Sequence, residues 1–112
     1  MSLQYMKSAD VPESEGLPFE GSLSLSGAGN SNWIVIPNGV QTIAVTVTPT
    51  TATAKVQTTT DTIATLEASG EVAVDWDAGE VSSSTQDVCS PVTAIRLVQV
   101  GAGSSIMTVR AQ

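Results

Sequence analysis

The sequence contains no histidine, a single cysteine (Cys89) and only four basic residues. Without histidine, the Ser–His and Cys–His pairs of nucleophilic enzymes cannot form. A single cysteine excludes a disulfide within the chain, so packing alone must hold the fold. The scattered Lys and Arg residues, in a chain of net charge −7, are too few to neutralise phosphates. Nucleic acids and anionic membrane surfaces are therefore not expected partners.

Long apolar runs are also missing. No segment approaches the roughly 20 apolar residues of a membrane span, and residues 1–16 lack the apolar stretch of a signal peptide. We therefore expect a protein that folds in a bacterial cytoplasm and is not secreted through a signal peptide. With 112 residues, the chain is expected to form a single domain.

Charged residues make up 13% of the sequence, against about 25% in ordinary soluble domains. Surfaces covered by partners are depleted in Lys and Glu, so this composition indicates a homo-oligomer or a larger assembly. A second interpretation is a Thr-rich β-domain whose outer faces are polar and uncharged. The composition does not choose between the two.

Residues 1–20 differ from the rest of the chain. They contain two prolines and four acids, with no helical or strand periodicity. The pattern predicts an extended N-terminal arm, and Leu3, Tyr5 and Met6 are its candidate contacts with a partner. The alternative is a terminal tail without a role.

From Gly21 to Gln112 the sequence alternates between apolar and polar residues in short runs that end at turn residues. The segment 62–68 is expected to be a strand, with a short helical turn as the alternative, and 78–91 is expected to be a loop. The predicted fold is all-β, an antiparallel β-sandwich or jelly roll of seven or eight strands. The other expected strands are 22–26, 33–36, 42–48, 52–60, 71–77, 93–100 and 106–111.

Few residues suggest chemistry. Asp75, Asp77 and Glu80 resemble half of a calcium loop, but the full ligand spacing is absent. We therefore expect no metal site, no cofactor and no catalytic residue, and we expect the chain not to be an enzyme. Cys89 precedes an apolar strand and is expected to be a small buried residue.

Trp33 and Trp76 could stack on a sugar, but both lie among apolar strand residues, which favours packing in the core. Arg96 interrupts the apolar strand 93–100. An arginine in that position pairs with an acid, for which Asp61 and Asp75 are the candidates, or lies at an interface.

Three segments carry a resemblance to a known class of proteins. They read NWIVIPNGVQTIAVTVTP, AKVQTTTDTIATLE and VDWDAGEVSSSTQDVCSPVTAIRLVQVGAGSSIMTVRAQ. Together they resemble small virion proteins of tailed bacteriophages, in particular the jelly-roll decoration (cement) proteins of the capsid. The resemblance implies a viral structural protein that bridges and stabilises capsid subunits, with capsid or other virion proteins as partners. It places the mature protein in the virion.

The alternative function is a carbohydrate- or receptor-binding β-sandwich, such as a tail-fibre or lectin-like module. It depends on the two Trp residues and on the polar loops 27–32 and 78–90.

Overall fold

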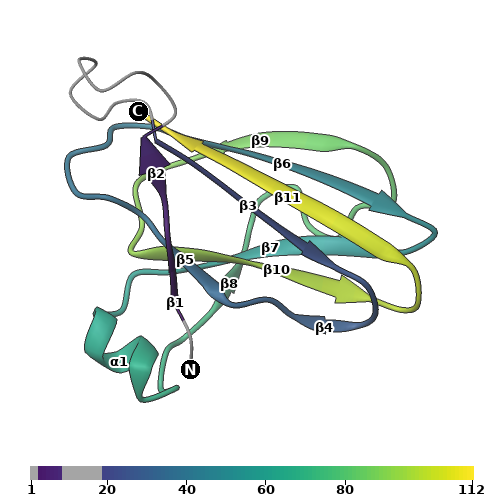
Figure 1. Ribbon diagram of the computed structural model, residues 1–112, viewed down its shortest axis with the longest axis horizontal. Coiled ribbons are helices and arrows are strands. Elements are labelled where there is room, and N and C mark those ends of the chain that lie inside the picture. The colour runs from purple at the N-terminus through teal and green to yellow at the C-terminus, as the bar shows by residue number, and fades with distance from the viewer. Residues whose placement is uncertain (1–2, 9–18) are drawn as a thin grey trace.

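The computed structural model describes residues 3–8 and 19–112, and it contains two β-sheets that pack face to face (Figure 1). Sheet A has the order β1-β5-β10-β7-β8, with β4 also paired to β10, and sheet B has the order β2-β3-β11-β6-β9. The strands of sheet A are β1 (Leu3–Tyr5), β4 (Gly29–Asn30), β5 (Trp33–Val35), β7 (Thr53–Thr59), β8 (Val74–Asp75) and β10 (Ala94–Val100). Those of sheet B are β2 (Lys7–Ser8), β3 (Phe19–Leu25), β6 (Ile43–Thr50), β9 (Thr85–Cys89) and β11 (Ser104–Ala111). The predicted all-β sandwich is confirmed.

The core lies between the two sheets and follows the alternation of the sequence. In β6, every second residue from Ile43 to Val47 is fully buried, whereas Ala44 and Thr46 between them lie on the outer face. Successive side chains of a strand point to opposite faces of the sheet, so one apolar row per strand is enough to fill the interior. The buried residues of this core are Ile34, Ile36, Val40, Ile43, Val45, Val47, Ala54, Val56, Trp76, Ile95, Leu97, Met107, Val109 and Ala111.

Two tight turns carry the chain from one sheet to the other at the same end of the sandwich. One joins β6 to β7 through Thr51, and the other joins β10 to β11 through Gly101 and Gly103. Gly103 has φ = 120°, and a Cβ atom there would lie 2.5 Å from the carbonyl oxygen of Thr50. The two turns therefore pack against each other at a point where only glycine fits.

Beneath this pair of turns lies a buried polar cluster. The amide of Gln99 donates hydrogen bonds to the carbonyl oxygens of Gly101 and Gly103, and Ser105 Oγ donates to Gln99 Oε1 at 2.7 Å. Gln99 and Ser105 are both nearly inaccessible to solvent. Because each polar group has a partner, the cluster fixes the turn without the cost of an unsatisfied buried group.

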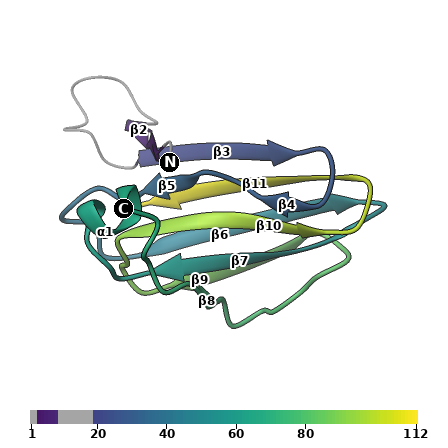
Figure 2. The ribbon, with the colours of Figure 1, turned by 90° about the horizontal axis from the view of Figure 1, so that it is seen from below.

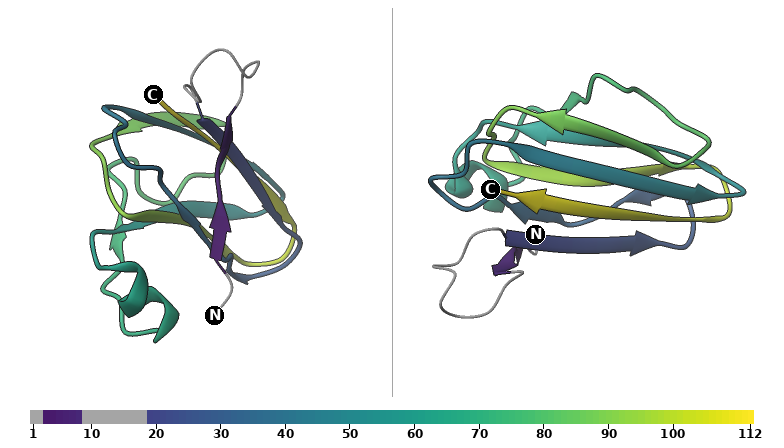
Figure 3. Two further views of the ribbon diagram at one scale, coloured as in Figure 1. Left: turned by 60° about the vertical axis from the view of Figure 1, so that its left-hand side comes forward. Right: turned by 90° about the horizontal axis from the view of Figure 1, so that it is seen from above.

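The helix α1 (Ile63–Glu67) lies on the outer side of sheet A (Figures 1 and 3). Thr62 Oγ1 caps it by accepting a hydrogen bond from the backbone N–H of Thr65. Leu66 is fully buried in a second apolar cluster with Trp33 and Ala94. The strand expected at 62–68 is therefore wrong and its helical alternative is right, because capping and the burial of Leu66 outweigh the β-propensity of threonine and isoleucine.

Two further details differ from the sequence-based expectation. The expected loop 78–91 contains the strand β9, which pairs with β6 from Thr85 to Cys89. The expected strand 71–77 is regular only at Val74–Asp75, although Trp76 still reaches the core. None of the helices among the described residues is long and apolar enough to cross a membrane.

Candidate interaction surfaces

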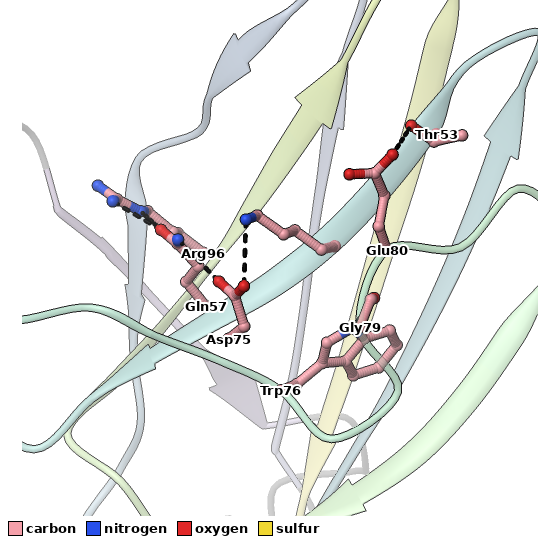
Figure 4. A network of polar contacts seen from close by, with 8 residues as sticks. Thr53, Gln57, Asp75, Trp76, Gly79, Glu80 and Arg96 are labelled. Atoms are coloured by element: carbon pink, nitrogen blue, oxygen red, sulfur yellow. Dashed lines mark hydrogen bonds and ion pairs between the residues drawn. The ribbon is translucent and has the colours of Figure 1, made fainter.

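A polar network covers part of the outer face of sheet A (Figure 4). Asp75 of β8 accepts hydrogen bonds from Lys55 Nζ at 3.1 Å and from Gln57 Nε2 at 3.0 Å. Arg96 of β10 donates to Gln57 Oε1 from Nε at 2.9 Å and from Nη2 at 2.7 Å. The hydrogen bonds from Gln57 and Lys55 lower the pKa of the Asp75 carboxyl. Three neighbouring strands are thus joined by one charged network.

The other side of the Arg96 guanidinium rests on Trp33 of β5, 4.5 Å from the ring centroid. Trp33 is fully buried beneath it, and burial lowers the pKa of Arg96, an effect that nearby Glu71 opposes. The sequence left open an acid partner or an interface for Arg96. In the structure Arg96 reaches Asp75 only through Gln57, whereas Asp61 accepts hydrogen bonds from Thr59 Oγ1 and from the backbone N–H of Val72. An interface role for Arg96 remains a prediction.

Residues 3–8 close one side of the sandwich (Figure 2). β1 runs parallel to β5 at the edge of sheet A, and β2 runs antiparallel to β3 at the edge of sheet B. The chain therefore passes from one sheet to the other within six residues. Residues 1–2 and 9–18, twelve of the twenty residues of the expected arm, lie outside the described residues.

The three expected contacts of the arm have different surroundings. Leu3 packs against the cluster of Trp33 and Leu66, and Met6 packs against the main core. Tyr5 is 61% exposed. Leu3 and Met6 thus contact the chain's own body, and binding of a partner by any of the three remains a prediction.

The opposite side of the sandwich, which we name the open side, contains the edge strands β8 and β9 (Figure 2). It also carries three exposed valines. Val72, Val74 and Val88 are between 58% and 69% exposed. Among the described residues, neither β8 nor β9 has a strand partner on its outer edge. A groove of about 270 Å³ lies between the two edges, and its lining includes Val74 and Val88 together with the acidic residues Asp75, Asp77 and Asp87. The alternation of apolar and polar residues did not reveal this site, because the exposure of Val72 and Val74 depends on where β8 ends.

Two acidic residues next to the open side, Asp75 and Glu80, form hydrogen bonds within the fold. Asp75 binds Lys55 and Gln57, and Glu80 accepts a hydrogen bond from Thr53 at 2.6 Å (Figure 4). Trp76 Nε1 donates to the carbonyl oxygen of Gly79, which closes the turn between them. Within residues 3–8 and 19–112, no group of three or more acidic, Cys or His side chains has the geometry of a metal site.

Cys89 is half-buried against the main core at the inner edge of β9. Burial raises the pKa of its thiol, and the negative charges of Asp87 and Asp77 raise it further. A thiol that holds its proton in this way is a poor nucleophile at neutral pH.

Both tryptophans are buried, as the apolar pattern predicted. Trp76 is 5% exposed in the main core, and Trp33 is inaccessible beneath Arg96. Neither ring offers a free face to a sugar.

No family model matches this chain, and no protein of known annotation matches it in sequence. The fold is similar to that of oxalate oxidase, at 15% identity and a TM-score of 0.58, over 95% of this chain and 47% of the other. Oxalate oxidase in complex with glycolate gives 16% identity, a TM-score of 0.57 and the same coverage. This chain thus spans about half the length of the oxalate oxidase chains. A Bacillus endospore appendage pilus protein aligns at 12% identity with a TM-score of 0.47, covering 86% of this chain and 87% of the other.

The likeness to oxalate oxidase corrects one expectation from the sequence. The absence of histidine led us to expect that the chain is not an enzyme, but its jelly-roll fold is one that an enzyme uses. At this level of identity the likeness establishes the fold alone. The absence of histidine therefore does not exclude an enzyme.

Proposed function

We propose that this chain is a structural subunit of a bacteriophage particle, of the capsid-decoration type, that binds neighbouring shell subunits through its open side. The observation that carries the proposal is the asymmetry between the two sides of the sandwich. Residues 3–8 cover one pair of sheet edges, whereas nothing in the described part of the chain covers β8 and β9, which lie beside exposed valines.

An uncovered strand edge is a ready site for another protein. Its free N–H and C=O groups can accept an added strand, which contributes main-chain hydrogen bonds and needs no specific chemistry. Burial of exposed Val74 and Val88 would add apolar contact at about 25 cal/mol per Å². The groove between β8 and β9 gives an inserted side chain a place to lie.

The remaining character of the chain agrees with this role. Packing without a disulfide suits a protein that folds in a host bacterial cytoplasm before it joins the virion. A net charge of −7 also limits unproductive binding to DNA during assembly. In this proposal the partners are capsid or other virion proteins.

The carbohydrate-binding alternative is not proposed. It required an accessible tryptophan, and both Trp33 and Trp76 are buried.

The first test is the composition of the particle. We expect phage particles purified by gradient centrifugation from the host that encodes this chain to contain it at a fixed, high copy number, measured by quantitative mass spectrometry. Absence from the particles, or only a few copies in each, would overturn the decoration role.

The second test locates the contact. Val74→Asp replaces an apolar side chain of the groove by a fourth carboxylate and is expected to lower binding to particles stripped of the protein by at least about tenfold. Val100→Asp is the matched control, because Val100 is 44% exposed on β10 and is not part of the open side. Equal binding by the two variants would rule out the open side as the contact.

A further inference from the structure

The outer face of sheet B is a flat array of short, uncharged side chains. Ser22, Thr108, Thr46 and Gln86 lie directly opposite one another on β3, β11, β6 and β9. The next row along the sheet contains Ser24, Ile106 and Thr48. The right panel of Figure 3 looks onto these four strands, which lie side by side with the helix on the far side of the molecule. We name this surface the hydroxyl face.

Charge is almost absent from the hydroxyl face. Among its described side chains only Glu20 and Arg110 are charged, and they lie opposite each other on neighbouring strands at one end. Their charges cancel, so the net charge of −7 is carried by the rest of the chain. The outer face of sheet A differs, because it presents Lys55, Asp75 and Arg96 and is partly covered by α1.

Two apolar side chains stand out from the hydroxyl face. Ile106 is 49% exposed near its middle, and Val88 is 61% exposed at the edge formed by β9. A flat partner laid on the sheet would bury Ile106, whereas Val88 lies at the margin shared with the open side.

We propose that the hydroxyl face is the surface through which two copies of this chain bind each other. Two bodies of charge −7 repel each other, and the arrangement with the least repulsion brings their uncharged faces together. Ser and Thr lose little side-chain entropy when they are fixed, and their hydroxyl groups both donate and accept hydrogen bonds. The same patch on both copies produces a closed dimer with two-fold symmetry.

This inference deepens the proposed function, because a dimer presents two open sides and can bridge two shell subunits. The two contacts are centred on different surfaces, which meet at Val88 on β9. The centre of the hydroxyl face, Thr108, lies on β11, whereas the particle contact is tested at Val74 on β8. The two proposals can therefore fail separately.

The test is sedimentation velocity of the full chain over a wide concentration range. Wild type is expected to show a reversible dimer, and Thr108→Glu is expected to raise the dissociation constant by at least about tenfold. Ala64→Glu is the matched control: it gives the same net charge but lies on the exposed side of α1, and it should dimerise as wild type does. High salt should partly restore the Thr108→Glu dimer by screening the added charges.

A wild-type chain that stays monomeric at every concentration overturns the inference. So does a Thr108→Glu dimer as tight as that of Ala64→Glu. Melting temperatures measured at concentrations where both variants are monomeric should match, which shows that Thr108→Glu acts on association and not on folding. If dimerisation follows these expectations but the chain is absent from particles, only the decoration role fails.

Discussion

The guanidinium of Arg96 lies 4.5 Å from the centre of the Trp33 ring and donates two hydrogen bonds to Gln57. Its planar group is thus held by an aromatic face and by an amide oxygen at once. Lysine cannot reproduce the planar stack on the ring or the pair of hydrogen bonds, because its ammonium is a point charge without a planar fork. This relationship makes the contribution of Arg96 to the fold measurable by a single conservative substitution.

We expect Arg96→Lys to lower the free energy of unfolding by about 1–2 kcal/mol, through loss of the stack and of one charge-assisted hydrogen bond. Arg110→Lys, at an exposed position of β11, should change it by less than about 0.5 kcal/mol. Urea unfolding followed by tryptophan fluorescence measures both. Equal values for the two variants would show that the stack does not stabilise the fold.

Alanine substitutions at three neighbouring N-terminal positions are expected to affect the stability of the fold differently. Leu3→Ala and Met6→Ala remove half-buried side chains that pack on the two apolar clusters, and each should cost about 1 kcal/mol or more. Tyr5→Ala removes an exposed ring and should leave the melting temperature nearly unchanged. Thermal denaturation monitored by circular dichroism checks the order. If none of the three lowers the melting temperature, residues 3–8 do not hold the sandwich together in solution.

Cys89 gives a prediction for alkaline pH. Its folded pKa is raised above the ordinary value of 9.0, so the folded chain holds the thiol proton more tightly than the unfolded chain does. As pH rises through 9.0 the unfolded chain ionises first, and the free energy of unfolding falls until the folded thiol ionises as well. Below that range the thiol contributes nothing to the pH dependence.

The measurement is urea unfolding at a series of pH values from neutral to alkaline. Wild type should lose more stability above about pH 9 than Cys89→Ser, which lacks the titrating group but keeps every other one. Parallel curves would contradict the raised pKa. A direct check is thiol modification near pH 8, which should be slower in the native chain than in urea.

Strands whose two faces differ were predictable from sequence. The alternation of Ile43, Val45 and Val47 with Ala44 and Thr46 defined β6, and the apolar run from Ala94 defined β10. The burial of both tryptophans followed from the same pattern. Alternation reports the environment of each face, and that environment is the same wherever the strand lies in the sheet.

Features that depend on which strands lie next to each other in a sheet were not predictable from the sequence. β9 has polar residues on both of its faces, so Thr85–Cys89 resembles a loop until it is paired with β6. The bridge from Arg96 to Asp75 through Gln57 requires knowing that β10, β7 and β8 are adjacent. The hydroxyl face was foreseen only as a general property of uncharged outer surfaces, because its rows combine four strands far apart in sequence.

The positions of β10 and β11 affect how the molecule is made. Each is a central strand of its sheet, and each is synthesised after both of its neighbours: β5 and β7 precede β10, and β3 and β6 precede β11. On the ribosome the earlier strands therefore wait with unpaired edges until β10 and β11 emerge, and such edges are prone to aggregation. Most pairings join distant segments, which also slows folding. A chain that stops after Val100 would leave β3 and β6 with no strand between them, so premature termination would split sheet B into the pairs β2–β3 and β6–β9 instead of shortening it at one edge.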